Sequence, residues 1–99
     1  MLLVSCKKRV SFDGYVYSKY NVPLRDVRVR LGIHATSSSY STYDEYTKTD
    51  STGHFIFDFE PEKRRAFLKI ECFCDSGRVN DDYDNFREID GKTIYLHLK

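Results

Sequence analysis

The 99-residue sequence contains no tryptophan, and it has only two prolines, five glycines and one methionine. So little proline and glycine excludes collagen-like and low-complexity chains. The formal net charge is only +1, which argues against a polycationic nucleic-acid-binding protein. There are three cysteines, an odd number, so the sequence does not indicate a framework of paired disulfides.

Aromatic and aliphatic residues are abundant instead. The chain is 40% hydrophobic and 15% aromatic, with eight tyrosines and seven phenylalanines. This composition excludes an intrinsically disordered chain. A chain of this length forms one domain and buries roughly 65% of the surface that it exposes when unfolded. We therefore expect a single modest core that needs no metal or disulfide to hold it together.

The near-zero net charge conceals an uneven distribution. Residues 1–40 contain seven basic and two acidic residues, a net charge of +5, whereas residues 41–99 have a net charge of −4. Such asymmetry can orient a protein near a charged surface. Two separately solvated faces explain it equally well.

The first residues form a short apolar segment that stops at a cysteine. Leu3-Val4-Ser5-Cys6 resembles the lipobox of bacterial lipoproteins and is followed by Lys7-Lys8-Arg9. The resemblance implies that residues 1–9 are a signal-peptide remnant and tether, that Cys6 carries the lipid, and that residues 10–99 form the domain. Several acyl chains would give stable membrane anchoring. The alternative is a short strand at Leu2–Val4 with an ordinary buried cysteine.

Alternation of apolar and polar residues dominates the rest of the chain and indicates β-strands. Asp50–Gly53 reads as a turn with Gly53 at positive φ, and Gly14 marks a bulge or a close backbone approach. Asp75–Asp90 reads as a polar loop with a short helix at Asp81–Arg87. The sequence thus predicts a single antiparallel Greek-key β-sandwich of about seven strands. Strands are expected at 10–17, 27–34, 40–49, 55–59, 67–74 and 93–98.

Three segments of the sequence follow a known pattern: 12–17 (FDGYVY), 22–31 (VPLRDVRVRL) and 47–57 (TKTDSTGHFIF). Together they resemble the carboxypeptidase regulatory-like family of transthyretin-like (prealbumin-like) β-sandwiches. The residues that match this family's pattern are structural, so the resemblance implies a fold rather than a reaction. It also implies an accessory module or a small envelope lipoprotein.

One enzyme family shares the transthyretin-like architecture, 5-hydroxyisourate hydrolase. Its chains end in a Tyr-Arg-Gly-Ser motif, whereas this sequence ends in Tyr95-Leu96-His97-Leu98-Lys99. The departure argues against that activity, and we predict that the protein is not an enzyme.

Tyrosines give the clearest indication of a binding surface. Tyr40, Tyr43 and Tyr46 lie close together in the sequence, and Tyr15, Tyr17 and Tyr20 form a second group. Tyrosine offers amphipathic contact area at a low entropic cost. We predict a surface for peptide or glycan at Tyr40, Tyr43 and Tyr46, although half-buried tyrosines can also simply cover a sheet.

Metal sites and catalytic groups have weaker support. Asp81, Asp82 and Asp84 offer hard oxygen ligands suited to Ca²⁺ but lack EF-hand spacing. Cys72 and Cys74 lie two residues apart, where a strand holds the side chains too parallel for a disulfide, so both are expected to be small hydrophobic residues at the edge of the core. The three histidines form no ligand motif. We therefore predict no catalytic residue, no metal and no cofactor.

The sequence-based hypothesis is a non-enzymatic lipoprotein of the bacterial cell envelope. It would be tethered through Cys6 at the outer membrane, facing the periplasm or the cell surface, with a structural or protein-interaction role. The alternative is a peptide- or glycan-binding accessory module of a larger envelope complex. No nucleic acid is expected as a partner.

Overall fold

The computed structural model describes residues 9–34, 43–60, 67–75 and 77–99. Within these ranges no helix is long and apolar enough to cross a membrane. Residues 1–8, with the lipobox-like segment and Cys6, lie outside the described part of the chain. The elements are β1 (Val10–Tyr17), β2 (Arg28–His34), β3 (Tyr43–Lys48), β4 (His54–Phe59), β5 (Phe67–Cys74), β6 (Gly77–Tyr83), the 3₁₀ helix η1 (Phe86–Glu88) and β7 (Thr93–His97).

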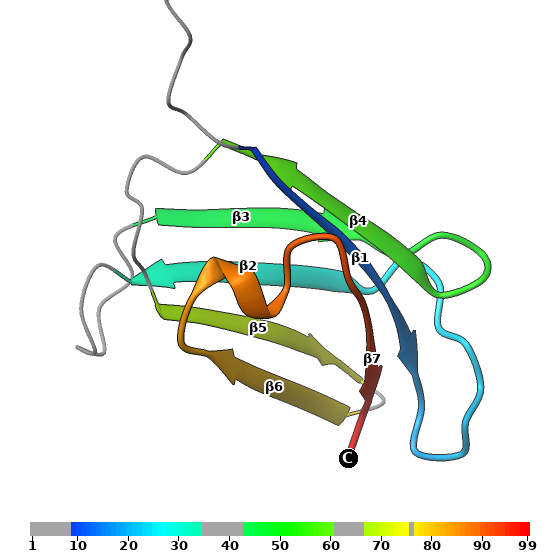
Figure 1. The fold of residues 1–99 in the computed structure, drawn as a ribbon. Coiled ribbons are helices and arrows are strands. Elements are labelled where there is room, and N and C mark those ends of the chain that lie inside the picture. Colours follow the sequence, from blue (N-terminus) through cyan, green and yellow to red (C-terminus); the bar gives the residue numbers. More distant parts are fainter. Residues whose placement is uncertain (1–8, 35–42, 61–66, 76) are drawn as a thin grey trace, which may run out of the picture.

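The seven strands form two sheets that pack as a sandwich (Figure 1), so the predicted all-β fold class is confirmed. One sheet has three strands in the order β4-β1-β7, and the other has four in the order β3-β2-β5-β6. Pairing is antiparallel except between β1 and β7, which run parallel with Asp13 opposite Thr93 and Tyr17 opposite His97. This parallel pair decides which outward side chains of β1 and β7 become neighbours.

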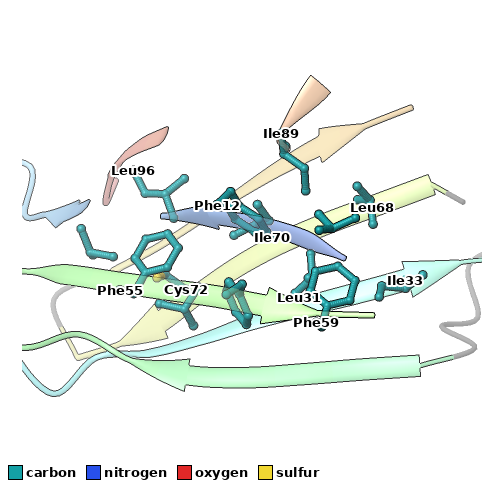
Figure 2. Close-up of a cluster of buried hydrophobic side chains, with 14 of the residues drawn as sticks. Phe12, Leu31, Ile33, Phe55, Phe59, Leu68, Ile70, Cys72, Ile89 and Leu96 are labelled. Atoms are coloured by element: carbon teal, nitrogen blue, oxygen red, sulfur yellow. The ribbon is translucent and has the colours of Figure 1, made fainter. Parts of the chain in front are cut away.

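The core lies between the two sheets and consists of the inward residues of each strand. Figure 2 shows Phe55 and Phe59 of β4 meeting Leu31, Ile70 and Cys72 of the other sheet. Phe55, Phe57 and Phe59 of β4 are all buried, whereas Ile56 is 56% exposed. Alternation therefore assigns each strand an inner and an outer face, and the outer faces carry the polar and tyrosine residues.

The prediction for Asp75–Asp90 was wrong in its local structure. The segment contains strand β6, which pairs with β5 along its whole length, and the expected helix at Asp81–Arg87 is replaced by the shorter η1. Asp and Asn are poor strand formers, but pairing with β5 and the packing of Val79 and Tyr83 against the core outweigh that preference.

The predicted turn before β4 is confirmed. Gly53 has a φ of +80°, and one carboxylate oxygen of Asp50 accepts hydrogen bonds from the backbone N–H groups of Thr52 (2.8 Å) and His54 (3.0 Å). The buried Thr49 adds a second constraint, since its hydroxyl donates to the carbonyl of Leu24 (2.6 Å) and accepts from the N–H of Val27 (2.9 Å). These bonds fix the start of β4 and thus the position of His54.

Candidate functional site

The outer face of the three-stranded sheet gathers tyrosines and histidines from three strands. In β1 the inward residues are Phe12, Gly14 and Val16, so Tyr15 and Tyr17 point outward. The sheet register places Tyr15 opposite His54 of β4 and Tyr95 of β7, and Tyr17 opposite His97 of β7. We call this surface the tyrosine–histidine face; its members are Tyr15, Tyr17, His54, Tyr95 and His97.

The five rings of the face form two adjoining rows. The first row crosses the sheet from His54 through Tyr15 to Tyr95, with ring centroids 4.8 and 5.7 Å apart and only 10° between the planes of the two tyrosines. The second row is Tyr17 against His97, at 5.2 Å. Tyr15 and Tyr17 connect the rows at 6.3 Å. These stacked and tilted contacts restrict the rotation of the five rings.

Hydrogen bonds fix both imidazoles of the face. His54 Nε2 lies 2.7 Å from Asp13 Oδ2, and the hydroxyl of Thr93 donates to Asp13 Oδ1 at 2.6 Å. His97 Nε2 lies 3.0 Å from Asn21 Oδ1. The pKa of the Asp13 carboxyl lies below its usual value. The hydrogen bond from Thr93 is the largest cause, and the hydrogen bond from His54 is the second. The Asp13 carboxylate therefore positions a residue from each neighbouring strand.

This arrangement predicts an acid-dependent effect of the isosteric change Thr93→Val. The variant loses a donor to the Asp13 carboxylate, so the pKa of Asp13 should rise toward the ordinary value of an aspartate. A carboxyl whose pKa is lowered by folding stabilises the protein above its unfolded-state pKa, and this contribution disappears as the pH falls through the lowered value. At pH 7 we expect the variant to have a lower free energy of unfolding than the wild type. This difference should narrow as the pH falls through the pKa of Asp13 in the folded protein.

Two measurements check this prediction. NMR titration of the Asp13 side-chain carboxyl reports its pKa, and urea unfolding at neutral and acidic pH reports the stability difference. An unchanged Asp13 pKa in Thr93→Val would show that the hydroxyl does not hold the carboxylate.

A shallow open depression adjoins the rings at the start of β1. It has a volume of about 310 Å³ and is lined by Ser11, Phe12, Asp13, Ile56, Gly91 and Lys92. It thus combines a hydroxyl, a carboxylate and an ammonium group with the largely exposed side chain of Ile56. Asp13 belongs both to the depression and to the hydrogen bonds that hold His54, so the two features are continuous.

Asp13 is hydrogen-bonded to both His54 and Thr93. Both ring nitrogens of His54 face carboxylates, Nε2 at 2.7 Å from Asp13 and Nδ1 at 4.0 Å from Asp50. The Thr93 hydroxyl is committed to Asp13. Among the residues that the structure describes, no three His, Cys, Asp or Glu side chains come together in a way that could hold a metal ion.

Of the three tyrosines predicted to form a binding surface, Tyr46 lies on the other sheet. Tyr46, on β3, is 52% exposed, and the guanidinium of Arg28 lies 5.0 Å from the centre of its ring. The backbone of Tyr43 belongs to β3, but its side chain and the whole of Tyr40 lie outside the described residues. The proposed contact surface at these three tyrosines stays a prediction.

The weak calcium candidates lie on a strand rather than in a loop. Asp81 and Asp82 are consecutive residues of β6, opposite Ile70 and Lys69 of β5, and Asp84 follows the strand. Consecutive strand residues point to opposite faces. Asp82 thus shares a face with Lys69. Asp81 lies on the same face as Tyr83. Burial raises the pKa of Tyr83, and the nearby Asp81 carboxylate raises it further. Asp81 and Asp82 therefore do not converge on one point.

Cys72 and Cys74 are both free thiols, and their environments differ. Cys72 is buried, and burial raises the pKa of its thiol to about 12, whereas Cys74 is only partly buried at the end of β5. A thiol with that pKa is ionised in only about one molecule in ten thousand at pH 8. We expect iodoacetamide to alkylate Cys74 readily and Cys72 only after unfolding.

Matched variants that each remove one of these two cysteines test this difference. Mass spectrometry of Cys74→Ser reports the alkylation of Cys72, and Cys72→Ala reports that of Cys74, each with and without urea. Equal rates for the two thiols in the folded protein would contradict the prediction.

Sequence reasoning did not single out Tyr95, His54 and His97 as members of one site. Alternation alone places Tyr95 and His97 on the polar side of the last strand, and it does the same for Tyr15 and Tyr17 on the first. The missing information was the pairing of β1 with β7, which no local pattern encodes. The number of outward aromatic residues on each strand is the signal that could have favoured this face over the Tyr40–Tyr46 segment as the predicted binding surface.

No protein-family model matches this chain, and no curated protein matches it. The fold and the geometry of the tyrosine–histidine face therefore carry the functional argument.

Proposed function

We propose that the protein is a non-enzymatic binding module that contacts its partner through the tyrosine–histidine face. The observation that carries this proposal is the state of the three phenols of Tyr15, Tyr17 and Tyr95. Their rings are stacked in place, yet none of the three hydroxyls is hydrogen-bonded to another described residue. Each hydroxyl can both donate and accept a hydrogen bond.

The arrangement suits recognition because the rings are ordered before a partner arrives. Tyrosine loses little conformational freedom on binding, and rings already held by stacking lose less. Tyr95 is 57% exposed, so it supplies contact area without any rearrangement of the sheet. The mutual pairing of Asp13, His54 and Thr93 supports a positioning role for these residues and gives no support to proton transfer with a substrate.

Binding arrays test the proposal directly. The labelled protein is applied to a glycan array and to a peptide array, beside the variants Tyr95→Ala and Tyr46→Ala. We expect ligands whose signal falls at least tenfold in Tyr95→Ala and stays unchanged in Tyr46→Ala. The Tyr46→Ala control removes an equally exposed tyrosine from the other sheet.

The control also separates the two tyrosine surfaces. A signal lost in Tyr46→Ala and kept in Tyr95→Ala would assign binding to the Tyr40, Tyr43 and Tyr46 segment and overturn the present site. Ligands insensitive to both substitutions would also overturn it.

We further propose that the module acts in the bacterial cell envelope, anchored through a lipid on Cys6. The support is the lipobox-like Leu3-Val4-Ser5-Cys6 and the basic trio that follows. Metabolic labelling with an alkyne fatty acid, on protein expressed from its own gene, should label the wild type and not Cys6→Ser. Equal labelling of both would exclude lipidation at this cysteine.

A further inference from the structure

We infer that the tyrosine–histidine face binds a neutral oligosaccharide, an inference that rests on the proposed function and names its ligand class. Such a ligand presents many hydroxyl groups and, on the faces of its rings, patches of C–H bonds. The face offers complementary groups for both.

The ring geometry provides one exposed apolar surface. Tyr15 lies between His54 and Tyr95, so neighbouring rings cover both of its faces. Tyr95 lies on β7, an edge strand of the three-stranded sheet, and it ends this row. One face of its ring packs on Tyr15, and its 57% exposure leaves the remainder to solvent. A sugar ring can add to the row by stacking there, because an aromatic face attracts the C–H groups of a pyranose.

The hydrogen-bonding groups suit a ligand rich in hydroxyls. The phenols of Tyr15, Tyr17 and Tyr95 each combine one donor with acceptor lone pairs, as sugar hydroxyls do. Ser11, Asp13 and Lys92 line the adjoining depression and add a hydroxyl, a carboxylate and an ammonium group. A partner protein would instead need a deep, desolvated pocket for an anchoring side chain, which this shallow depression does not offer.

The charges around the face favour an uncharged ligand. Asp13 is paired with His54 at 2.7 Å, and Asp58 on the same side of β4 is paired with Arg9 at 2.9 Å. Single-stranded nucleic acids also stack on aromatic rings, but their binding requires a basic groove along the phosphates. Among the described residues, the face mixes the carboxylates of Asp13 and Asp58 with the cations of Arg9 and Lys92, so it provides no continuous basic groove.

The length of the site indicates a chain of sugars rather than one. Asp13 and Tyr17 are four residues apart on β1, a span of about 13 Å along a strand. The depression lies at the Asp13 end, and the Tyr17–His97 pair lies at the other. A short oligosaccharide can occupy the depression and reach both rows of rings.

The experiment uses three uncharged probes, the hexasaccharides of glucose with β-1,4 and α-1,4 links and of N-acetylglucosamine. Each is titrated into ¹⁵N-labelled protein and followed by NMR. We expect at least one to shift the amides of β1 and β7. Its affinity should fall about tenfold or more in Tyr95→Ala, fall less in Tyr95→Phe, which keeps the ring, and stay the same in Tyr46→Ala.

Three results would overturn the inference. The first is the absence of shifts with all three sugars at millimolar concentration, and the second is equal affinity in Tyr95→Ala. The third is binding of an acidic polysaccharide with a steep dependence on salt, in place of the neutral probes. Peptide-array ligands lost in Tyr95→Ala, without any sugar binding, would leave the binding module in place and reject the glycan. Failure of both ligand classes would reject the two proposals together.

Discussion

Replacement of Phe55 by alanine should lower the free energy of unfolding by about 3–5 kcal/mol. Phe55 is among the most completely buried side chains, and it lies in β4 between the two sheets (Figure 2). Its ring packs edge-on against Phe57, with centroids 5.8 Å apart. Domains of this size are stable by only about 5–15 kcal/mol, so the substitution removes about a fifth or more of the total. The melting temperature should fall by about 20 °C.

Ile56→Ala, the adjacent position on the same strand, is the matched control. Ile56 points to solvent and is 56% exposed, so its truncation leaves no buried cavity. Urea unfolding followed by circular dichroism should show a change below about 1 kcal/mol for this variant. A comparable loss for the two variants would mean that β4 is not packed with its phenylalanines inward.

Gly14→Val is the second substitution with a large expected effect. A Cβ atom at residue 14 would lie 2.5 Å from the Phe55 ring and 2.7 Å from the backbone carbonyl oxygen of Ile94. The carbonyl belongs to β7 and cannot move without disturbing its pairing with β1. Overpacking of this kind costs at least about 3 kcal/mol, and here it also separates the two strands that carry the tyrosine–histidine face.

A pair of variants isolates the cause of this loss. Gly14→Ala should destabilise less than Gly14→Val, and Phe55→Leu in the same chain should recover part of the deficit because leucine has no atom at the Phe55 Cζ position. Chemical denaturation of the wild type, Gly14→Val, Phe55→Leu and the double variant gives the coupling free energy between the two residues. Purely additive losses would show that residue 14 and residue 55 are not in contact.

Much of the sandwich could be predicted from single strands. The expected strand at Phe67–Cys74 has the same bounds in the structure, and the predicted close approach at Gly14 is confirmed by its neighbours Phe55 and Ile94. These features depend on alternation within a few residues. Strand β6 could not be predicted in this way, because its sequence disfavours a strand and its conformation depends on the pairing with β5.

The candidate site could be predicted only in part, for a related reason. The outward direction of Tyr15, Tyr17, Tyr95 and His97 follows from alternation. Their convergence depends on the register of β1 against β7, a contact between segments 80 residues apart. The sequence also brings Tyr40, Tyr43 and Tyr46 close together along the chain, but Tyr46 lies on the other sheet. Proximity along the chain is a poor guide to proximity on a face when strands from both ends share one sheet.

The parallel pair of β1 and β7 also has a consequence for how the chain folds. The contacts that join β2, β3, β5 and β6 have moderate sequence separation, whereas the pairing of β1 with β7 joins segments 80 residues apart. Closing so long a loop is slow, because its entropic cost precedes any gain from the contact. β1 therefore keeps an unpaired edge until β7, which follows every other described strand along the chain, has been synthesised, and the rings of the tyrosine–histidine face come together only then.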